Sequence, residues 1–215
     1  SAASRLYLPR SRKKEFMDRF LAELKAVKMG SPLDPSNFVN AVIDKGAFDT
    51  IGAYVDRAKA NPSCSILAGG SRDSSTGWFV EPTVIMTEDP RAEPMVEEIF
   101  GPVLTAYAYD DSDLDAAYRL VDQGAPYALT GAVFARERAD IDHALVALRN
   151  AAGNFYINDK PTGAVVGRQP FGGARASGTN DKAGSFLNLV RWTSPRAIKE
   201  NLAPPRNWRY PFLGT

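Results

Sequence analysis

The chain contains very few of the residues from which many catalytic centres are built. Its 215 residues include one cysteine and one histidine, Cys64 and His143. A single cysteine excludes an intrachain disulfide framework, and the two residues together give no convincing zinc site, Cys-His pair or Ser-His-Asp triad. Cys64 stands among serines at the head of an apolar run, which favours an inert, buried thiol. His143 follows Asp140 and Asp142 and precedes Ala144 on a predicted helix, which favours a solvated helix face.

An excess of charge of one sign and a long apolar run are also missing. The 26 basic and 25 acidic residues leave a net charge of +1, which gives no electrostatic footprint for nucleic acid or for an anionic membrane surface. No apolar stretch approaches the roughly 18 residues needed to span a bilayer. We therefore expect neither a nucleic acid nor a membrane as a partner, and a reducing compartment fits the lone thiol.

The first residues carry no initiator methionine. The chain opens Ser-Ala-Ala-Ser-Arg and enters an apolar, strand-like run almost at once. Natural N-termini usually begin with a few loosely held residues. We expect this chain to be a piece of a longer protein.

Apolar periodicity predicts strands that alternate with helices. The predicted strands span 6–8, 64–68, 79–86, 103–109, 129–134 and 153–157, and the predicted helices span 16–27, 45–60, 113–123 and 136–149. This alternation predicts an α/β fold with a mostly parallel, open sheet and helices on both faces. Residues 189–198 form a further strand candidate outside the alternating core, where an edge strand could pair with another subunit.

A glycine-rich loop follows the last strand of the alternating core. Five glycines lie between Gly163 and Gly178, and loops of this length are usually functional or disordered. Arg168, Arg175 and Lys182 suggest a phosphate cradle, but the chain has neither a Gly-Lys-Ser/Thr ending nor a Gly-x-Gly-x-x-Gly fingerprint. A backbone cradle for a smaller anion, such as a carboxylate, is the more plausible binding role. A purely structural loop is the alternative.

A second candidate site is an acidic pair followed by an aromatic residue and a Gly-Pro turn. Glu97 and Glu98 precede Ile99-Phe100-Gly101-Pro102. Carboxylates beside an exposed aromatic ring could bind ribose hydroxyls and a flat ring. A surface acid pair over a buried Phe100 would give the same sequence, and residue types alone favour neither interpretation.

Several motifs resemble those of the aldehyde dehydrogenase family, in the expected order. They are Glu97-Glu-Ile-Phe-Gly-Pro-Val103, Tyr127-Ala-Leu-Thr-Gly-Ala-Val-Phe134 and Pro170-Phe-Gly-Gly173. Gly153-Asn-Phe-Tyr-Ile-Asn-Asp-Lys160, with Thr162-Gly-Ala-Val-Val-Gly167, is similar to the branch that oxidises glutamate semialdehyde to glutamate with NAD, in proline catabolism. The resemblance runs from Ser1 to about Trp208 and covers nearly the whole chain.

The resemblance implies roles for particular residues. Glu98 would bind the nicotinamide ribose, and Phe100 would pack near the nicotinamide. The backbone of Gly163 and Ala164 would bind the carboxylate of the semialdehyde. Phe171 would pack on the aliphatic chain of the substrate.

The resemblance also implies what the chain lacks. Ser1 matches the position just after the family's nucleophilic cysteine and would also touch the substrate carboxylate, so the nucleophile would directly precede Ser1. The NAD domain, the general-base glutamate and the oxyanion donor would lie further upstream. NAD is implied as the cofactor of the full-length enzyme, and we expect this chain alone to be inactive because reacting groups must lie within hydrogen-bond reach of each other.

The resemblance further implies a division of the chain and a place in the cell. Residues 1–188 would belong to the catalytic domain, and 189–215 would form an oligomerisation strand and tail in a homo-oligomer. The location would be the mitochondrial matrix in a eukaryote and the cytoplasm otherwise. The alternatives are a piece of another aldehyde dehydrogenase and a non-catalytic binding or oligomerisation module.

Overall fold

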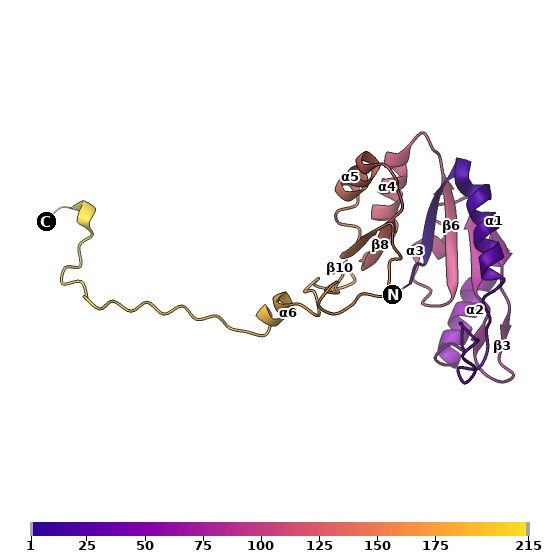
Figure 1. The fold of residues 1–215 in the computed structure, drawn as a ribbon, viewed down its shortest axis with the longest axis horizontal. Coiled ribbons are helices and arrows are strands. Elements are labelled where there is room, and N and C mark those ends of the chain that lie inside the picture. Colours follow the sequence, from indigo (N-terminus) through magenta and orange to yellow (C-terminus); the bar gives the residue numbers. More distant parts are fainter. Residues whose placement is uncertain (1, 214–215) are drawn as a thin grey trace.

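The computed structural model describes residues 2–213, which form two lobes and an extended C-terminal tail (Figure 1). The first lobe is built on a four-stranded sheet of order β1-β6-β5-β2. Its strands are β1 (Arg5–Pro9), β2 (Cys64–Ala68), β5 (Thr83–Thr87) and β6 (Val103–Tyr109). β6 pairs in parallel with both β1 and β5, and β2 pairs antiparallel with β5. The predicted open, mostly parallel sheet is therefore confirmed.

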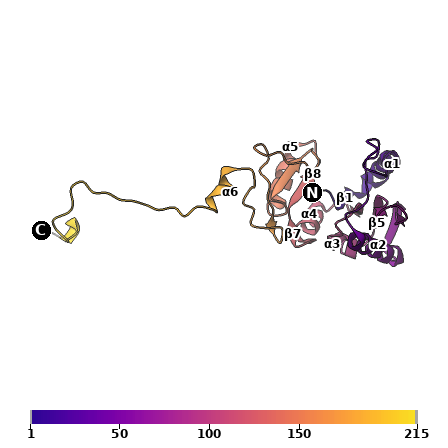
Figure 2. The same cartoon turned by 90° about the horizontal axis from the view of Figure 1, so that it is seen from below.

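Two helices cover opposite faces of this sheet because successive strand residues point to opposite sides. On one face Val84, Met86 and Ala106 pack against α1 (Lys13–Leu24). On the other face Ile85 and Val103 pack against α2 (Lys45–Ala60). Figure 2 shows α1 and α2 on either side of β5. Each buried large aliphatic side chain contributes roughly 1.5–3 kcal/mol, so the two faces supply the main core of the lobe.

The second lobe follows β6 in the chain. It contains α4 (Leu114–Gln123), α5 (Arg138–Ala147) and a separate parallel pair of β8 (Thr130–Val133) and β9 (Asn154–Ile157). The short strands β7 (Tyr127–Ala128) and β10 (Ala174–Arg175) pair antiparallel beside them. The predicted alternation of strands and helices is confirmed, but among residues 2–213 the strands form one four-stranded sheet and three two-stranded sheets rather than one continuous sheet.

Proline divides one of the predicted strands. Residues 79–86 form β4 (Phe79–Val80), which pairs with β3 (Arg72–Asp73), and then β5. Pro82 lies between them and has no N–H to donate to a ladder.

The single chain does not form a strand over residues 189–198, the candidate for pairing with another subunit. The start of this range lies in a short helix, α6 (Phe186–Val190), and irregular backbone follows to the one-turn helix at Pro211–Leu213. Figure 1 shows this tail leading away from both lobes. A strand needs a neighbour for its backbone hydrogen bonds, and none of the described strands lies beside the tail. Within the described residues, no helix is long and apolar enough to cross a membrane.

Candidate active site

Phe100 is the most unusual residue on the surface of the first lobe. The short helix α3 (Glu93–Val96) ends just before the acidic pair, and Phe100 follows with φ of +56°. A bulky residue rarely adopts this left-handed conformation, and such outliers concentrate at functional sites. Phe100 is 87% exposed, whereas the preceding Ile99 is only 8% exposed and packs in the core beneath α2. The core residue of this segment is therefore Ile99, and the interpretation of Phe100 as a buried side chain is wrong.

Gly101 explains how the backbone comes so close to α2. A Cβ at Gly101 would lie 2.6 Å from Cδ1 of Ile51, a fully buried side chain of α2. On the other side, the N–H of Thr83 donates to the carbonyl of Pro102 at 2.8 Å and ties the turn to β5. The backbone around Phe100 is thus held at both ends.

The two carboxylates before Phe100 are exposed. Glu93, one helical turn earlier, forms an ion pair with Arg57 at 2.9 Å. Neither Glu97 nor Glu98 has an ion-pair partner among residues 2–213. An exposed carboxylate beside an exposed aromatic ring can accept hydrogen bonds from a diol and pack against a flat ring.

The glycine-rich loop starts from a fixed point at the carboxyl end of β9. Asn158 has φ of +54°, and its side-chain amide exchanges two hydrogen bonds of 2.9 Å with the N–H and the carbonyl of Ala135. Its own N–H donates to Val133 at 2.8 Å. This anchor fixes where the loop leaves the sheet.

The segment around Gly163 and Ala164 offers backbone donors. Gly163 has φ of +77°, a conformation that glycine adopts readily. The N–H groups of Gly163 and Ala164 donate to no acceptor within the part of the chain that the structure describes. The next N–H, from Val165, donates to the side chain of Gln169 at 3.0 Å and closes a small turn. Two free donors beside a closed turn can bind an anion such as a carboxylate.

Phe171 lies further along the same loop in a tightly bonded segment. It exchanges two backbone hydrogen bonds with Ala183, at 2.8 and 2.7 Å. The amide of Asn154, a buried residue of β9, donates to the carbonyl of Pro170 at 3.2 Å and accepts from the N–H of Gly172 at 3.1 Å. The backbone on both sides of the Phe171 ring is therefore fixed.

Two of the three cations suggested for a phosphate cradle are committed elsewhere. Arg175 forms an ion pair with Asp122 at 2.5 Å, which ties the loop to α4. Lys182 donates to the carbonyls of Gly153 and Gly172 at 2.6 and 3.2 Å. Burial lowers the pKa of the Lys182 amine. Arg168 is the one of these three cations whose side chain has no ion pair or hydrogen bond among residues 2–213, so the loop suits a small anion better than a phosphate.

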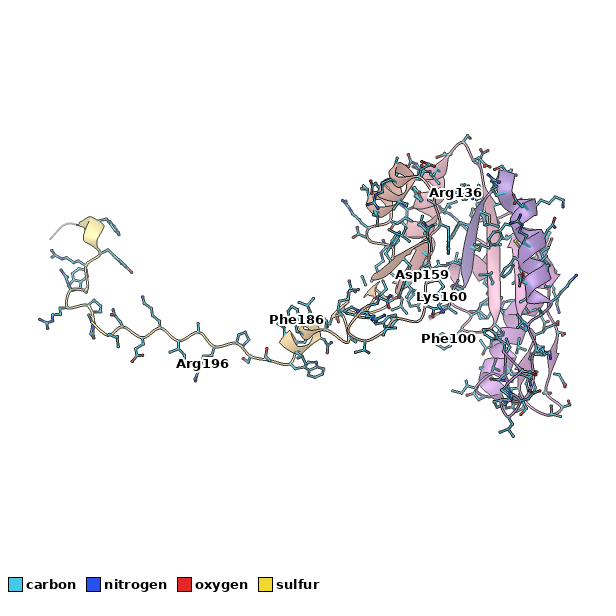
Figure 3. All side chains as sticks on the ribbon, in the orientation of Figure 1. Phe100, Arg136, Asp159, Lys160, Phe186 and Arg196 are labelled. Carbon is cyan, nitrogen blue, oxygen red and sulfur yellow. The ribbon has the colours of Figure 1, made fainter. Side chains whose placement is uncertain are left out.

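Figure 3 shows how the two candidate segments lie. Phe100, from the first lobe, and Asp159 and Lys160, at the start of the glycine-rich loop, lie near the boundary between the two lobes in this view. The loop follows the carboxyl end of β9, as predicted, whereas Phe100 comes just before the amino end of β6.

The lone thiol lies away from these segments. Cys64 is half-buried against the core beneath α2 and pairs with Thr87, the last residue of β5. Thr87 in turn lies opposite Tyr107, near the end of β6, whereas Phe100 precedes the start of that strand. Cys64 is therefore at the opposite end of the sheet, consistent with the predicted inert role.

His143 does more than lie on a solvated face. Although exposed, its Nε2 is 2.8 Å from Oδ1 of Asp115, and its ring packs edge-on against Tyr118 with centroids 5.2 Å apart. It therefore links α5 to α4 inside the second lobe.

Ser1 lies outside the described residues, so its predicted contact stays a prediction. Asn154 is the residue that sequence reasoning missed in this region, and Lys182 was considered only as a phosphate ligand. A lysine within a glycine-rich loop indicated a possible functional role, but its partners are backbone carbonyl groups, which no sequence motif predicts. Among the described residues, no group of three or more His, Cys, Asp or Glu side chains could hold a metal ion.

Comparison with known proteins identifies the class of protein. Residues 1–197 match the model of the aldehyde dehydrogenase family, and the chain belongs to that family. Its relatives narrow the assignment to one branch.

Two curated relatives are both named delta-1-pyrroline-5-carboxylate dehydrogenase, mitochondrial. The protein from Dictyostelium discoideum is 55% identical over 213 residues, and that from Bos taurus is 52% identical over 214 residues. Each match covers 99% of this chain and 38% of the relative. The chain thus spans about two fifths of the length of these relatives.

A solved structure supports the same branch. The crystal structure of the delta-pyrroline-5-carboxylate dehydrogenase from Mycobacterium tuberculosis is 46% identical, with a TM-score of 0.86, and the match covers 98% of this chain and 39% of that one. The same protein bound with NAD matches with a TM-score of 0.84. The predicted family and branch are confirmed.

Proposed function

We propose that this chain forms one wall of the active site of an NAD-dependent pyrroline-5-carboxylate dehydrogenase, which oxidises glutamate semialdehyde to glutamate. The observation that carries the proposal is the outward, left-handed Phe100 beside the unpaired Glu98. The relatives that share this fold bear the name of that enzyme, and one of them binds NAD.

The exposed groups of the first lobe fit the nicotinamide half of NAD. The Glu98 carboxylate is free to accept hydrogen bonds from ribose hydroxyls, and the Phe100 ring offers an apolar surface to the nicotinamide. Bound NAD would accept a hydride from the oxidised carbon of the substrate. Glu98 and Phe100 orient the cofactor; neither of them transfers a proton.

The glycine-rich loop fits the substrate. The free N–H groups of Gly163 and Ala164 would donate to the carboxylate of the semialdehyde, and Phe171 would pack on its aliphatic chain. Fixed donors of this kind lose little conformational freedom on binding, which favours affinity and orientation. Ser1, at the start of the chain, would add a contact to the same carboxylate.

The chemical groups that attack the aldehyde would come from the part of the relatives that this chain does not span. We place the nucleophilic cysteine directly before Ser1, and the general base and the NAD domain further upstream. The described residues would then supply positioning and selectivity rather than a reacting group.

We also propose an assembly and a location for the protein. We propose that the tail from residue 189 pairs with another subunit of a homo-oligomer and gains there the strand neighbour that the single chain lacks. The relatives from Dictyostelium discoideum and Bos taurus are named mitochondrial, and we propose the mitochondrial matrix as the location if the source is a eukaryote.

The test is NADH formation from pyrroline-5-carboxylate and NAD by three proteins. They are the 215-residue chain, its Cys64→Ala variant and a full-length enzyme carrying Cys before Ser1. We expect no NADH from either form of the chain, and activity from the full-length enzyme that favours the semialdehyde over an uncharged aliphatic aldehyde of similar length. If the 215-residue chain forms NADH and its Cys64→Ala variant does not, the proposal is wrong. Full-length preference for the uncharged aldehyde would assign the chain to another aldehyde dehydrogenase.

A further inference from the structure

The segment Pro170-Phe171-Gly172 is held by a set of hydrogen bonds that leaves its backbone almost no freedom. Phe171 uses its own N–H and carbonyl in the pair of bonds with Ala183. The two flanking peptide groups, the carbonyl of Pro170 and the N–H of Gly172, are both bonded to the side chain of Asn154. One buried amide thus replaces a neighbouring strand on the other side of Phe171.

Lys182 adds further hydrogen bonds to those that hold this segment. Its Nζ lies 2.6 Å from the carbonyl of Gly153, 3.2 Å from that of Gly172 and 3.5 Å from Oδ1 of Asn154. It therefore bridges the start of β9 to the residue after Phe171 and supports Asn154 as well. Its three donors match three acceptors in number.

Lys182 also lacks the usual partner of a lysine. Within residues 2–213 no carboxylate lies within ion-pair distance of its ammonium. Its backbone is left-handed, with φ of +55°. Strain of this kind persists only where the surrounding structure demands it, and here it directs the side chain under the loop.

We infer that Asn154 and Lys182 are positioning residues that hold the Phe171 ring at the orientation required by the substrate chain. This inference deepens the proposed function, on which it rests for the identity of the substrate. Neither side chain has to touch the substrate, because both act through the backbone on either side of Phe171.

Space at the loop supports this role. A Cβ at Gly153 would lie 2.0 Å from the carbonyl oxygen of Gly172, so the loop backbone lies directly on the start of β9. Without the ammonium, the carbonyls of Gly153 and Gly172 would face each other with no donor between them. Buried acceptors left without a donor favour a displaced backbone, and a displaced backbone at Gly172 moves the neighbouring ring.

The main test compares Lys182→Met with Lys59→Met. Lys59 is a matched control, since its Nζ also donates to a backbone carbonyl, that of Gly70 at 2.5 Å, but in the first lobe. In the 215-residue chain, hydrogen exchange of the Phe171 and Gly172 amides should become at least about tenfold faster in Lys182→Met, as expected when a local hydrogen-bonded unit opens more easily. The Lys59 variant should leave these two amides unchanged.

Kinetics in the full-length enzyme test the consequence for substrate. The KM for the semialdehyde should rise about tenfold in Lys182→Met, a factor that corresponds to about 1.4 kcal/mol of binding, while kcat and the KM for NAD change less than about twofold. Lys182→Arg, which keeps a cationic donor, should recover part of the loss. A general loss of folding would change kcat and both KM values together. Lys182→Arg would then not selectively recover the KM for the semialdehyde.

A second variant covers the case in which Lys182→Met does not fold. Asn154→Ala keeps the bonds of Lys182 to Gly153 and Gly172 but frees the peptide groups on both sides of Phe171, and it should show the same exchange and KM pattern. Unchanged exchange at Phe171 in both variants would overturn the inference, as would faster exchange with an unchanged KM for the semialdehyde. If the wild-type full-length enzyme does not oxidise the semialdehyde, the proposed function fails, and the exchange experiment still decides whether the two residues hold Phe171.

Discussion

At the scale of single residues, the segment before β6 shows how a core can impose an unfavourable conformation on a surface residue. Ile99 is anchored beneath α2, and the backbone at Gly101 lies against Ile51. Between these two fixed points Phe100 has to turn outward with positive φ. The burial of Ile99 stabilises the segment by roughly 1.5–3 kcal/mol, enough to offset the strain of about 1–3 kcal/mol at Phe100.

Gly101→Ala tests this close approach. The new Cβ would meet Ile51 at 2.6 Å, inside van der Waals contact, so the core has to shift. We expect a loss of about 1–3 kcal/mol in the free energy of unfolding, the usual cost of an overpacked core, measured by urea denaturation. Ile51→Ala removes Cδ1, Cγ1 and Cγ2, the three atoms nearest to the new Cβ, so the double variant should lose less than the sum of the two single variants. Strict additivity would show that the two residues do not compete for space.

Asp111 follows β6 and contacts the segment just before α1. This contact makes a pH-dependent contribution to the stability of the fold. The carboxylate of Asp111 accepts hydrogen bonds from the hydroxyl of Ser11 and, at 2.9 Å, from the N–H of Ser11. These bonds lower the pKa of Asp111 below its ordinary value of 3.8. The folded protein therefore binds this proton less readily than the unfolded chain, so the contribution is full above the unfolded pKa and is lost as pH falls through the folded pKa.

The stability difference between wild type and Asp111→Asn should accordingly be constant near neutral pH and shrink below about pH 4. Urea denaturation at a series of pH values measures it. Ser11→Ala removes the hydroxyl donor and should reduce the same pH dependence. A difference that grows on acidification would contradict the assignment.

Sequence reasoning was strongest for apolar residues and weakest for polar contacts. It left the exposure of Phe100 open, since an apolar residue after an acidic pair fits either a core or a surface. Asn154 could not be identified because its role depends on the backbone of residues 170–172, which come close only in the folded chain. The roles of Glu98, Gly163 and Ala164 stay predictions.

At the scale of elements, α2 shows why the longer helices were predictable. Asp44 caps its first turn by accepting from the N–H of Ala47 at 2.7 Å, and the apolar side chains that follow recur on one face. Local signals of this kind need no information from the rest of the chain. The strand candidate over 189–198 rested on apolar composition and on the family resemblance, and its pairing depends on a neighbour that neither of them supplies within the single chain.

Removal of the α2 cap gives a prediction at this scale. Asp44→Ala should lower the free energy of unfolding by about 1 kcal/mol, because an N–H of the first turn loses its acceptor. Asp49→Ala, on the exposed face of the same helix, removes an ion pair with Lys45 at 2.5 Å and should cost only about 0.3–0.5 kcal/mol. Thermal or urea unfolding compares the two. Equal losses would mean that the cap contributes no more than a surface charge.

At the scale of the whole molecule, the two lobes, which together form the body, differ from the tail in how much of their surface is buried. The described side chains from 191 to 213 are exposed, whereas both faces of the first sheet are covered. The fold class followed from the order of elements. The separation of the described strands into several sheets did not, because pairing between distant strands is not encoded in local periodicity.

Deletion of residues 193–215 should therefore leave the urea midpoint of the body unchanged. The described part of this segment buries no side chain against either lobe, so its loss removes little apolar contact. Sedimentation of the same pair of proteins should show weaker self-association of the shorter form, if the tail pairs between subunits as proposed. A lower midpoint in the monomeric shorter form would reveal packing of the tail on the body.

The pairing of β1 with β6 also sets an order of events during synthesis. About 90 residues separate these neighbouring strands, whereas β5 and β6 are separated by roughly 15. Closing the longer loop costs roughly 1.5 kcal/mol more in chain entropy, at about 0.6 kcal/mol for each doubling of loop length. A growing chain that leaves the ribosome amino end first therefore presents β1 long before β6 has been made. The apolar face of α1, which packs on the same sheet, stays exposed during this time. Of the four strands in this sheet, β1 is made first and is one of the last to be enclosed, and until then its apolar surface is open to wrong contacts.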